Sequence, residues 1–135
     1  MFDRVVPGLV GEDAVRVELD KTARHLGSGQ VSVFATPEMI RLMERAAVKA
    51  VDPLLPDGYH TVGVDVDVHH LAATPLGMTV RARAELLQVD GRKLLFRVEA
   101  FDDVEKIGEG RHGRMIIDVV RFKERAEAKA RSALG

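Results

Sequence analysis

The stretch TPEMIRLMERAAVKAV, residues 36–51, has the pattern of one long amphipathic helix, because its apolar residues recur every three to four positions. It begins with Thr36-Pro37-Glu38: threonine is a good N-cap, proline suits the first turn, and an acid favours the positive end of the helix dipole. Asp52-Pro53 ends the pattern, because the residue before a proline disfavours helical geometry. The sequence therefore predicts a helix from Thr36 to about Val51.

Outside this helix much of the chain alternates with a period of two, which is typical of half-buried strands. Alternation runs through Val62–His70, and Asp90-Gly91 predicts a tight hairpin between two further strands. A short strand is predicted at Val15–Leu19, and a last strand at Ile107–Val120 is expected to bulge near Gly108–Gly113, where the apolar phase shifts. One helix and about five antiparallel strands define an α+β fold, and the length predicts a single domain, residues 1–135.

The alternation also predicts which side chains face the core. On the first long strand, Val62, Val64, Val66, Val68 and His70 share one face. On the hairpin, the predicted inward residues are Val80, Ala82, Ala84, Leu86, Leu94, Phe96, Val98 and Ala100. His25–Gln30 is predicted to be a loop, and Phe122–Ala130 a short charged helix or frayed tail. Because one helix covers only part of such a sheet, we expect a sheet edge to pair with a second copy.

Composition excludes several classes of protein. The chain has 20 basic and 21 acidic residues, so no basic face for nucleic acid is expected. It has no cysteine, which excludes disulfides and thiolate metal sites, and the adjacent His69-His70 pair is a poor chelate. No apolar run approaches the ~20 residues that cross a membrane, and Met1–Arg4 lacks the apolar run of a signal peptide. A cytoplasmic location, without a metal, a membrane or a nucleic-acid partner, is therefore predicted.

Glu44 is the most informative residue of the helix. Its neighbours on the helix surface are Ile40, Ala47, Val48 and Val51, whereas Arg41, Arg45 and Lys49 form a separate basic stripe. This pattern places the carboxylate in the apolar stripe, where an unpaired charge costs several kcal/mol. Glu44 therefore has two interpretations. Its carboxylate is either buried for a chemical purpose, or it lies at the edge of the stripe and pairs with a nearby arginine.

Four other residues have a structural and a chemical interpretation each. His70 is either a hydrogen-bonded core residue or a proton carrier. Thr36 is a helix cap, and the free amides beside it also attract a carbonyl oxygen that develops negative charge. Gly63 marks either a bulge or the close approach of a ligand. Arg114 is either a charge on the strand surface or an anion contact.

Taken in order, these residues resemble one family. Thr36, Glu44, Gly63, the stretch His70-Leu71-Ala72-Ala73-Thr74-Pro75 and Arg114 resemble the fluoroacetyl-CoA thioesterases and their relatives in the hot-dog fold superfamily. The resemblance spans roughly Val5 to Ala128, and the later hairpin progression agrees with it. It implies a hot-dog fold, in which one long central helix packs on an antiparallel sheet. It also implies hydrolysis of an acyl-CoA thioester to the free acid and CoA.

The resemblance further implies a site. Thr36, Glu44 and His70 match the catalytic positions of the family, and Gly63 and Arg114 match positions that place the substrate. No cofactor is implied, because the CoA thioester is the substrate. Thr36 and Glu44 lie about 12 Å apart along a straight helix, so either the chain bends at Thr36-Pro37 or the site combines residues of two subunits. The resemblance favours the second, a site at the interface of a homodimer or a dimer of dimers.

The chain also departs from the family pattern. It reads Gly27-Ser28-Gly29-Gln30 where the fluoroacetyl-selective member has an aromatic lid, and Arg45 replaces an aromatic residue beside the catalytic glutamate. These departures favour a small ordinary acyl group over a fluorinated one. The main alternative function is a non-catalytic acyl-CoA-binding protein of the same fold. An acyl-CoA hydratase is a further alternative, but it needs an acid–base pair over the acyl α and β carbons, and no Asp-His pairing suggests one. A purely structural dimer leaves the inward glutamate and the inward histidine unexplained.

Overall fold

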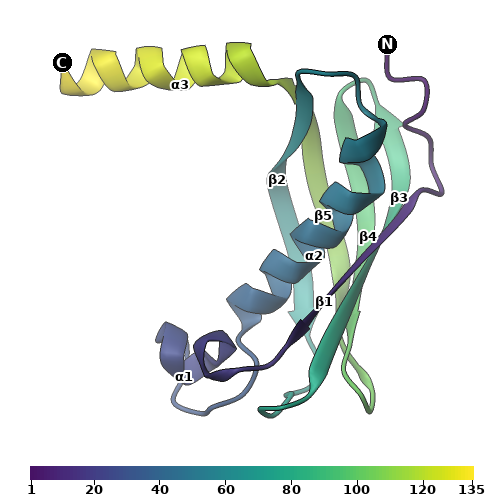
Figure 1. The fold of residues 1–135 in the computed structure, drawn as a ribbon, viewed down its shortest axis with the longest axis vertical. Helices are drawn as coiled ribbons and strands as arrows, with labels where there is room; N and C mark the ends of the chain where they lie inside the picture. The colour runs from purple at the N-terminus through teal and green to yellow at the C-terminus, as the bar shows by residue number, and fades with distance from the viewer.

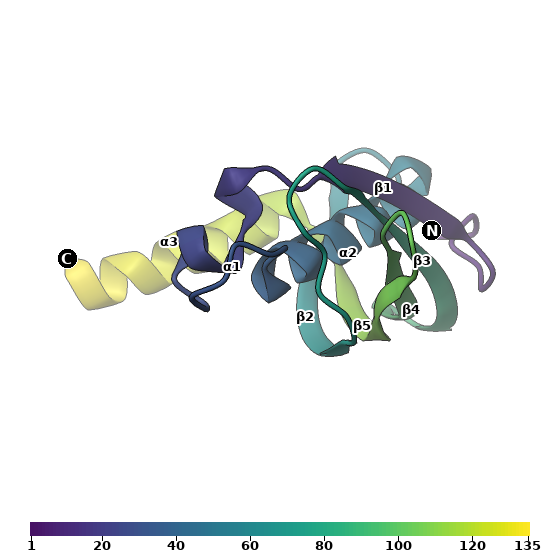
Figure 2. The ribbon, with the colours of Figure 1, turned by 90° about the horizontal axis from the view of Figure 1, so that it is seen from below.

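A long helix lies inside a curved antiparallel sheet in this protein, as Figures 1 and 2 show. The structure is a computed structural model and describes residues 1–135. The central helix is α2 (Thr36–Val51), and the sheet order is β1-β3-β4-β5-β2. The strands are β1 (Val10–Arg16), β2 (Tyr59–His70), β3 (Thr79–Asp90), β4 (Lys93–Phe101) and β5 (Lys106–Asp118). The predicted α+β class and the hot-dog arrangement are confirmed.

The core forms between α2 and the concave face of the sheet. The buried residues of α2 are Met39, Leu42, Met43, Ala46, Ala47, Ala50 and Val51. They pack against alternate residues of β3 and β4, all eight of which were predicted to face inward and are buried. Alanines on both surfaces let the helix lie close to the strands, and the Cβ-less Gly11 of β1 lies directly against the backbone of Ala46 and Ala50.

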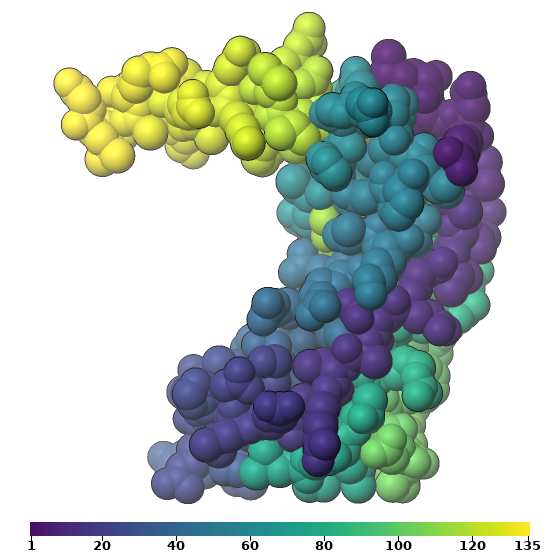
Figure 3. Space-filling model, viewed as in Figure 1, coloured from purple at the N-terminus to yellow at the C-terminus, as the bar shows by residue number.

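Smaller helical segments complete the chain. They are the 3-10 turns η1 (Leu19–Lys21) and η2 (Asp52–Leu54), the short helix α1 (Ala23–Leu26) and the C-terminal helix α3 (Val119–Leu134). Only part of the loop predicted at His25–Gln30 is irregular, because α1 continues to Leu26 and ends at Gly27, whose φ is +74°. Helix α3 is longer than predicted and projects from the body into solvent (Figures 1 and 3). No helix is long and apolar enough to cross a membrane.

Two local predictions are wrong. The first strand covers Val10–Arg16 rather than Val15–Leu19, because it pairs with β3 along its whole length. Thr36 is not the N-cap: Ala35 holds that position, and the threonine hydroxyl makes a different contact, described below. The irregularity predicted near Gly108–Gly113 of β5 is confirmed in part: Ile107, directly before Gly108, is the extra residue against β4, and the register against β2 shifts opposite Gly113, although the extra residue there belongs to β2.

Strand β2 is an edge strand with an unexpected surface. Its register against β5 shifts between Gly63 and Asp65, so Val64 is the extra residue of a bulge. Val64 and Val66 are 59% and 41% exposed, which contradicts the predicted inward valine face. The outer edge of β2 has no partner strand, so its backbone groups and these valines remain uncovered in one protomer.

Candidate active site

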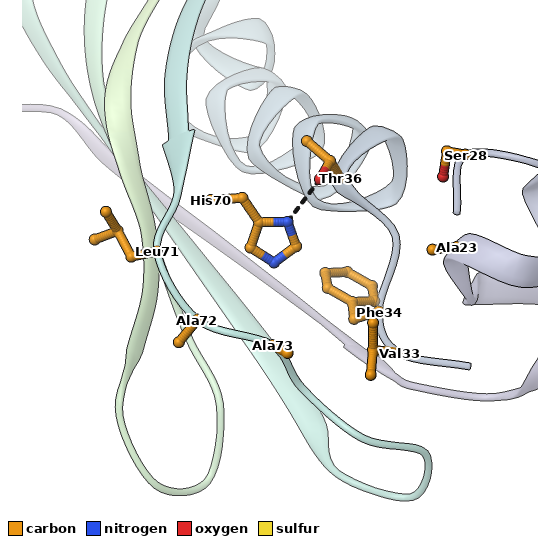
Figure 4. Close-up of a pocket in the computed structure, with 9 residues that line it drawn as sticks. All are labelled: Ala23, Ser28, Val33, Phe34, Thr36, His70, Leu71, Ala72 and Ala73. Atoms are coloured by element: carbon orange, nitrogen blue, oxygen red, sulfur yellow. Dashed lines mark hydrogen bonds between the residues drawn. The ribbon is translucent and has the colours of Figure 1, made fainter. Parts of the chain in front are cut away.

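Two predicted site residues meet where α2 begins and β2 ends. Thr36 is the first residue of α2, and His70 is the last residue of β2. The Oγ1 atom of Thr36 lies 2.7 Å from Nδ1 of His70, and Figure 4 shows this hydrogen bond. The other ring nitrogen, Nε2, is buried and has no hydrogen-bond partner in the chain. His70 is therefore held through one nitrogen and is free to exchange a proton through the other.

Burial keeps this imidazole neutral. It lowers the pKa of His70 below its ordinary value of 6.5, and the backbone of Ala72 opposes this shift in part. A neutral ring at pH 7 has one N–H donor and one lone pair. The pair Thr36–His70 can therefore carry a proton in either direction.

A pocket of about 350 Å³ opens beside this pair (Figure 4). Its lining is mostly apolar and comprises Ala23, Ser28, Val33, Phe34, Thr36, His70, Leu71, Ala72 and Ala73. The amides of Thr36 and Glu38, in the first turn of α2, make no hydrogen bond within the chain. A carbonyl oxygen placed here meets N–H donors at the positive end of a helix, which stabilise developing negative charge.

Glu44 forms a second cluster further along α2. Its Oε2 lies 3.4 Å from Nη1 of Arg114 and 4.0 Å from Nε2 of His112. Its side chain is 41% exposed, so the carboxylate lies at the edge of the buried stripe and pairs with an arginine. The structure therefore agrees with the interpretation that Glu44 lies at the edge of the stripe and pairs with an arginine. That arginine, Arg114, belongs to β5.

Arg114 is buried, only 5% exposed, and is neither a surface charge nor an open anion contact. Its Nε donates to Oγ1 of Thr61 at 2.8 Å, and Nη2 donates to the carbonyl of Thr61 at 3.0 Å. The Thr61 hydroxyl in turn donates to Oδ1 of Asp52 at 2.6 Å. Burial lowers the pKa of Arg114, and the charges of Asp52 and Glu44 oppose this shift. The guanidinium is therefore fixed on one side by Thr61, and its Nη1 lies within reach of both Glu44 and His112.

Gly63 is required by this second cluster. A Cβ atom there would lie 2.5 Å from Oε2 of Glu44, 3.2 Å from Cε1 of His112 and 3.4 Å from Nη1 of Arg114. Each of the two interpretations of Gly63 is confirmed in part. A bulge follows Gly63 directly, and another group lies close to its backbone. The approaching group is the Glu44 carboxylate of the same chain.

The two clusters are separate within one protomer. Thr36 and Glu44 are eight residues apart on a continuous helix, which is about 12 Å. The structure brings Thr36 to His70 and Glu44 to Gly63 and Arg114, but it does not bring Glu44 to His70. Sequence reasoning missed His112, which could have been found because His112, Arg114 and Ile116 share one parity of β5.

The buried His112 and the half-buried His70 predict a pH dependence of stability. Burial lowers the pKa of His112 and of His70, so the unfolded chain binds more protons than the native protein just below pH 6.5. Their contribution to stability is complete above this pH and is lost as pH falls through the native pKa values. The free energy of unfolding should therefore fall between pH 6.5 and 5, by at most about 1.4 kcal/mol per pH unit for each histidine. Urea unfolding at pH 7, 6 and 5 measures this, and equal stability at all three values would contradict it.

Solved structures first place the chain in a class. A hot-dog-like protein from Thermanaerovibrio acidaminovorans is 22% identical and superimposes with a TM-score of 0.86 over 94% of each chain, which shows the fold. A thioesterase superfamily member from Thermus thermophilus is 32% identical, with a TM-score of 0.80 over 92% of this chain and 97% of its own. The fold and these relatives define a hot-dog protein of the thioesterase class.

The family follows from closer matches. Residues 17–120 match the fluoroacetyl-CoA-specific thioesterase family. The fluoroacetyl-CoA thioesterase of Streptantibioticus cattleyicolor is 43% identical over 115 residues, which are 81% of this chain and 83% of that protein. A solved fluoroacetyl-CoA thioesterase is 39% identical, with a TM-score of 0.85 over 93% of this chain and 97% of its own. The chain belongs to the fluoroacetyl-CoA-specific thioesterase family, a family of thioester hydrolases, and the resemblance drawn from the sequence is confirmed.

Proposed function

We propose that this protein hydrolyses small acyl-CoA thioesters to the free acid and CoA, without a cofactor, and that it does so in the cytoplasm. The observation that carries the proposal is the hydrogen bond between Thr36 and His70 at the mouth of an apolar pocket, with Nε2 of His70 left unpartnered. A mutant of the related fluoroacetyl-CoA thioesterase has been solved with acetyl-CoA, which supports a small acyl substrate.

The pocket supports an ordinary acyl group over a fluorinated one. The Gly27–Gln30 segment supplies only Ser28 to the lining, and Phe34 is the one aromatic side chain there. Arg45, which takes the place of an aromatic residue of the family, pairs with Asp13 of β1 at 2.9 Å and is occupied there. No aromatic lid therefore closes over the acyl group.

The proposed reaction uses both clusters. The thioester carbonyl oxygen accepts from the Thr36 hydroxyl or from the first amides of α2, which stabilise the oxyanion. Glu44 either removes a proton from the attacking water or attacks the carbonyl itself to form an anhydride that water then hydrolyses. The carbon–sulfur bond breaks, and the proton released from water passes to the CoA thiolate through His70, whose neutral ring first accepts it at Nε2 and then donates it. Trapping an acyl group on Glu44 during turnover separates the two routes.

A second copy of the chain completes the proposed site. Glu44 does not reach His70 within one protomer, and the outer edge of β2 carries exposed valines and unpaired backbone groups. Figure 3 shows a hollow beside α2, between the projecting α3 and the segment around α1. Antiparallel pairing of two β2 edges brings the Tyr59 end of one strand towards the His70 end of the other. We propose a homodimer, or a dimer of such dimers, in which Glu44 of one protomer faces the Thr36–His70 pair of its partner.

The hydrolysis itself is tested by thiol release from a panel of acyl-CoAs. The panel should include acetyl-CoA, propionyl-CoA, fluoroacetyl-CoA and a long-chain acyl-CoA. We expect turnover of the short acyl groups and weak turnover of the long one, because the pocket is small. Tight binding without thiol release would instead favour the non-catalytic acyl-CoA-binding protein.

The shared site is tested by mixing two inactive variants. If Glu44 and His70 act across the interface, a heterodimer of Glu44→Gln and His70→Ala chains has one site with both substitutions and one intact site. Random reassortment of equal amounts makes half of the dimers mixed, so about a quarter of the native activity should return. The control is each variant mixed with itself. No recovery after verified subunit exchange would place Glu44 and His70 of one site on the same chain.

A further inference from the structure

His112 is a buried polar residue to which the reaction above gives no role. Its side chain lies on the inward face of β5, is only 1% exposed, and its ring lies 6.4 Å from that of Phe96 on β4. Its Nδ1 is 2.7 Å from the carbonyl oxygen of Asp65 on β2, and its Nε2 is 3.1 Å from Nη1 of Arg114. A buried histidine with both nitrogens bonded is a fixed part of a network.

The partners of the ring determine which nitrogen carries its proton. A backbone carbonyl only accepts, so the proton lies on Nδ1, which donates to Asp65. Nη1 of Arg114 only donates, so Nε2 must offer a lone pair. The charged groups that act on the ring are Arg114 on its own strand, Glu44 on α2 and Asp65 on β2. Burial, the largest influence, lowers the pKa of His112, which agrees with a neutral ring.

The lone pair of His112 accepts a hydrogen bond from Nη1, the one guanidinium nitrogen of Arg114 that does not bond to Thr61. Nε and Nη2 of Arg114 both bond to Thr61, whereas Nη1 is shared between Nε2 of His112 at 3.1 Å and Oε2 of Glu44 at 3.4 Å. Of these two acceptors, His112 is the buried one, while the Glu44 side chain is 41% exposed. His112 therefore fixes where Nη1 lies, and Nη1 fixes where the carboxylate lies.

We infer that His112 is a positioning residue for hydrolysis: its Nε2 lone pair holds Arg114 in the orientation that anchors the Glu44 carboxylate over Gly63. This inference rests on the proposed function, because it assumes that Glu44 acts on the thioester. It assigns His112 no contact with substrate. Protonation or loss of Nε2 would leave Nη1 of Arg114 without its buried acceptor. The Glu44 side chain, which is partly exposed, could then leave its position over Gly63.

Two substitutions separate the two hydrogen bonds of the ring. In His112→Gln, Oε1 lies near the position of Nε2 and can accept from Arg114. In His112→Asn, the amide lies near the position of Nδ1, so it can donate to Asp65 but cannot reach Arg114. We expect His112→Asn to lower kcat by about 10- to 100-fold with KM changed less than threefold, a loss like that seen when the hydrogen bonds that orient metal ligands are removed. His112→Gln should recover most of this loss. Equal losses in the two variants, or no loss in His112→Asn, would overturn the inference.

A readout without substrate makes the test independent of the proposed function. Hydrogen exchange at the Arg114 Nε–H, followed by ¹⁵N NMR, reports how firmly the guanidinium is held. It should be at least several-fold faster in His112→Asn than in His112→Gln, whose exchange should stay near that of the native protein. Equal exchange in the two variants would overturn the positioning role. Two results together would separate the claims. If exchange is faster in His112→Asn but the native protein releases no thiol from acyl-CoA, the positioning of Arg114 by His112 is supported and only the proposed function is rejected.

Discussion

Replacing Glu44 with Gln is expected to lower kcat for acyl-CoA hydrolysis by about 10²- to 10⁴-fold, the usual contribution of a positioned base or nucleophile. The amide keeps the size of the side chain, so it still fits over Gly63. It cannot take a proton from water or attack the thioester. KM should change much less, because Glu44 does not line the acyl pocket of its own protomer and the amide keeps the shape that the side chain presents to the pocket of the partner.

The control for this variant is Glu12→Gln on β1. Glu12 lies exposed on an edge strand at the opposite side of the sheet from β2 and forms no ion pair. The Glu12→Gln variant should keep kcat within about twofold of the native value, because substitutions at exposed surface positions usually have small effects. The thermal midpoint of both variants should stay close to that of the native protein. Native rates in Glu44→Gln would remove Glu44 from the reaction and leave only its ion pair with Arg114.

Gly11→Ala should be strongly destabilising. A Cβ atom at Gly11 would lie 2.1 Å from the carbonyl oxygen of Ala46 and 2.5 Å from the amide nitrogen of Ala50. Both atoms belong to the backbone of α2, which cannot move without displacing the core. We expect the free energy of unfolding to fall by about 3 kcal/mol, the upper part of the range for overpacked cores. That is a large share of the ~5–15 kcal/mol that stabilises a domain of this size.

Gly29→Ala is the matched control for this prediction. Its added Cβ would meet only the Cβ of Ala23 at 3.4 Å, an ordinary contact, and its φ is negative. The free energy of unfolding should change by less than about 0.5 kcal/mol. Urea unfolding of the two variants measures the difference. Equal stability of Gly11→Ala and Gly29→Ala would show that β1 is free to shift away from α2.

The sequence by itself determined the elements whose signals are local. Helix α2 begins and ends where its threonine-proline start and aspartate-proline stop predict. The β3–β4 hairpin turns at Gly91-Arg92, one residue past the predicted Asp90-Gly91, and its alternating apolar residues are all buried. These features depend on residues close together in the chain, as do the motifs that resemble the family. The fold class and the family could therefore be recognised before any coordinates.

Tertiary structure alone decided how the site is divided. The Thr36 hydroxyl bonds to His70 instead of capping the helix. His70 is 34 residues away in the chain and reaches Thr36 only once β2 lies beside α2. The exposure of the β2 valines depends on β2 being an edge, which is a property of strand order. Burial of His112 and Arg114 depends on Thr61, Asp65 and Glu44 supplying acceptors from other elements, because polar groups turn inward only where such partners exist. No pattern confined to one strand contains that information.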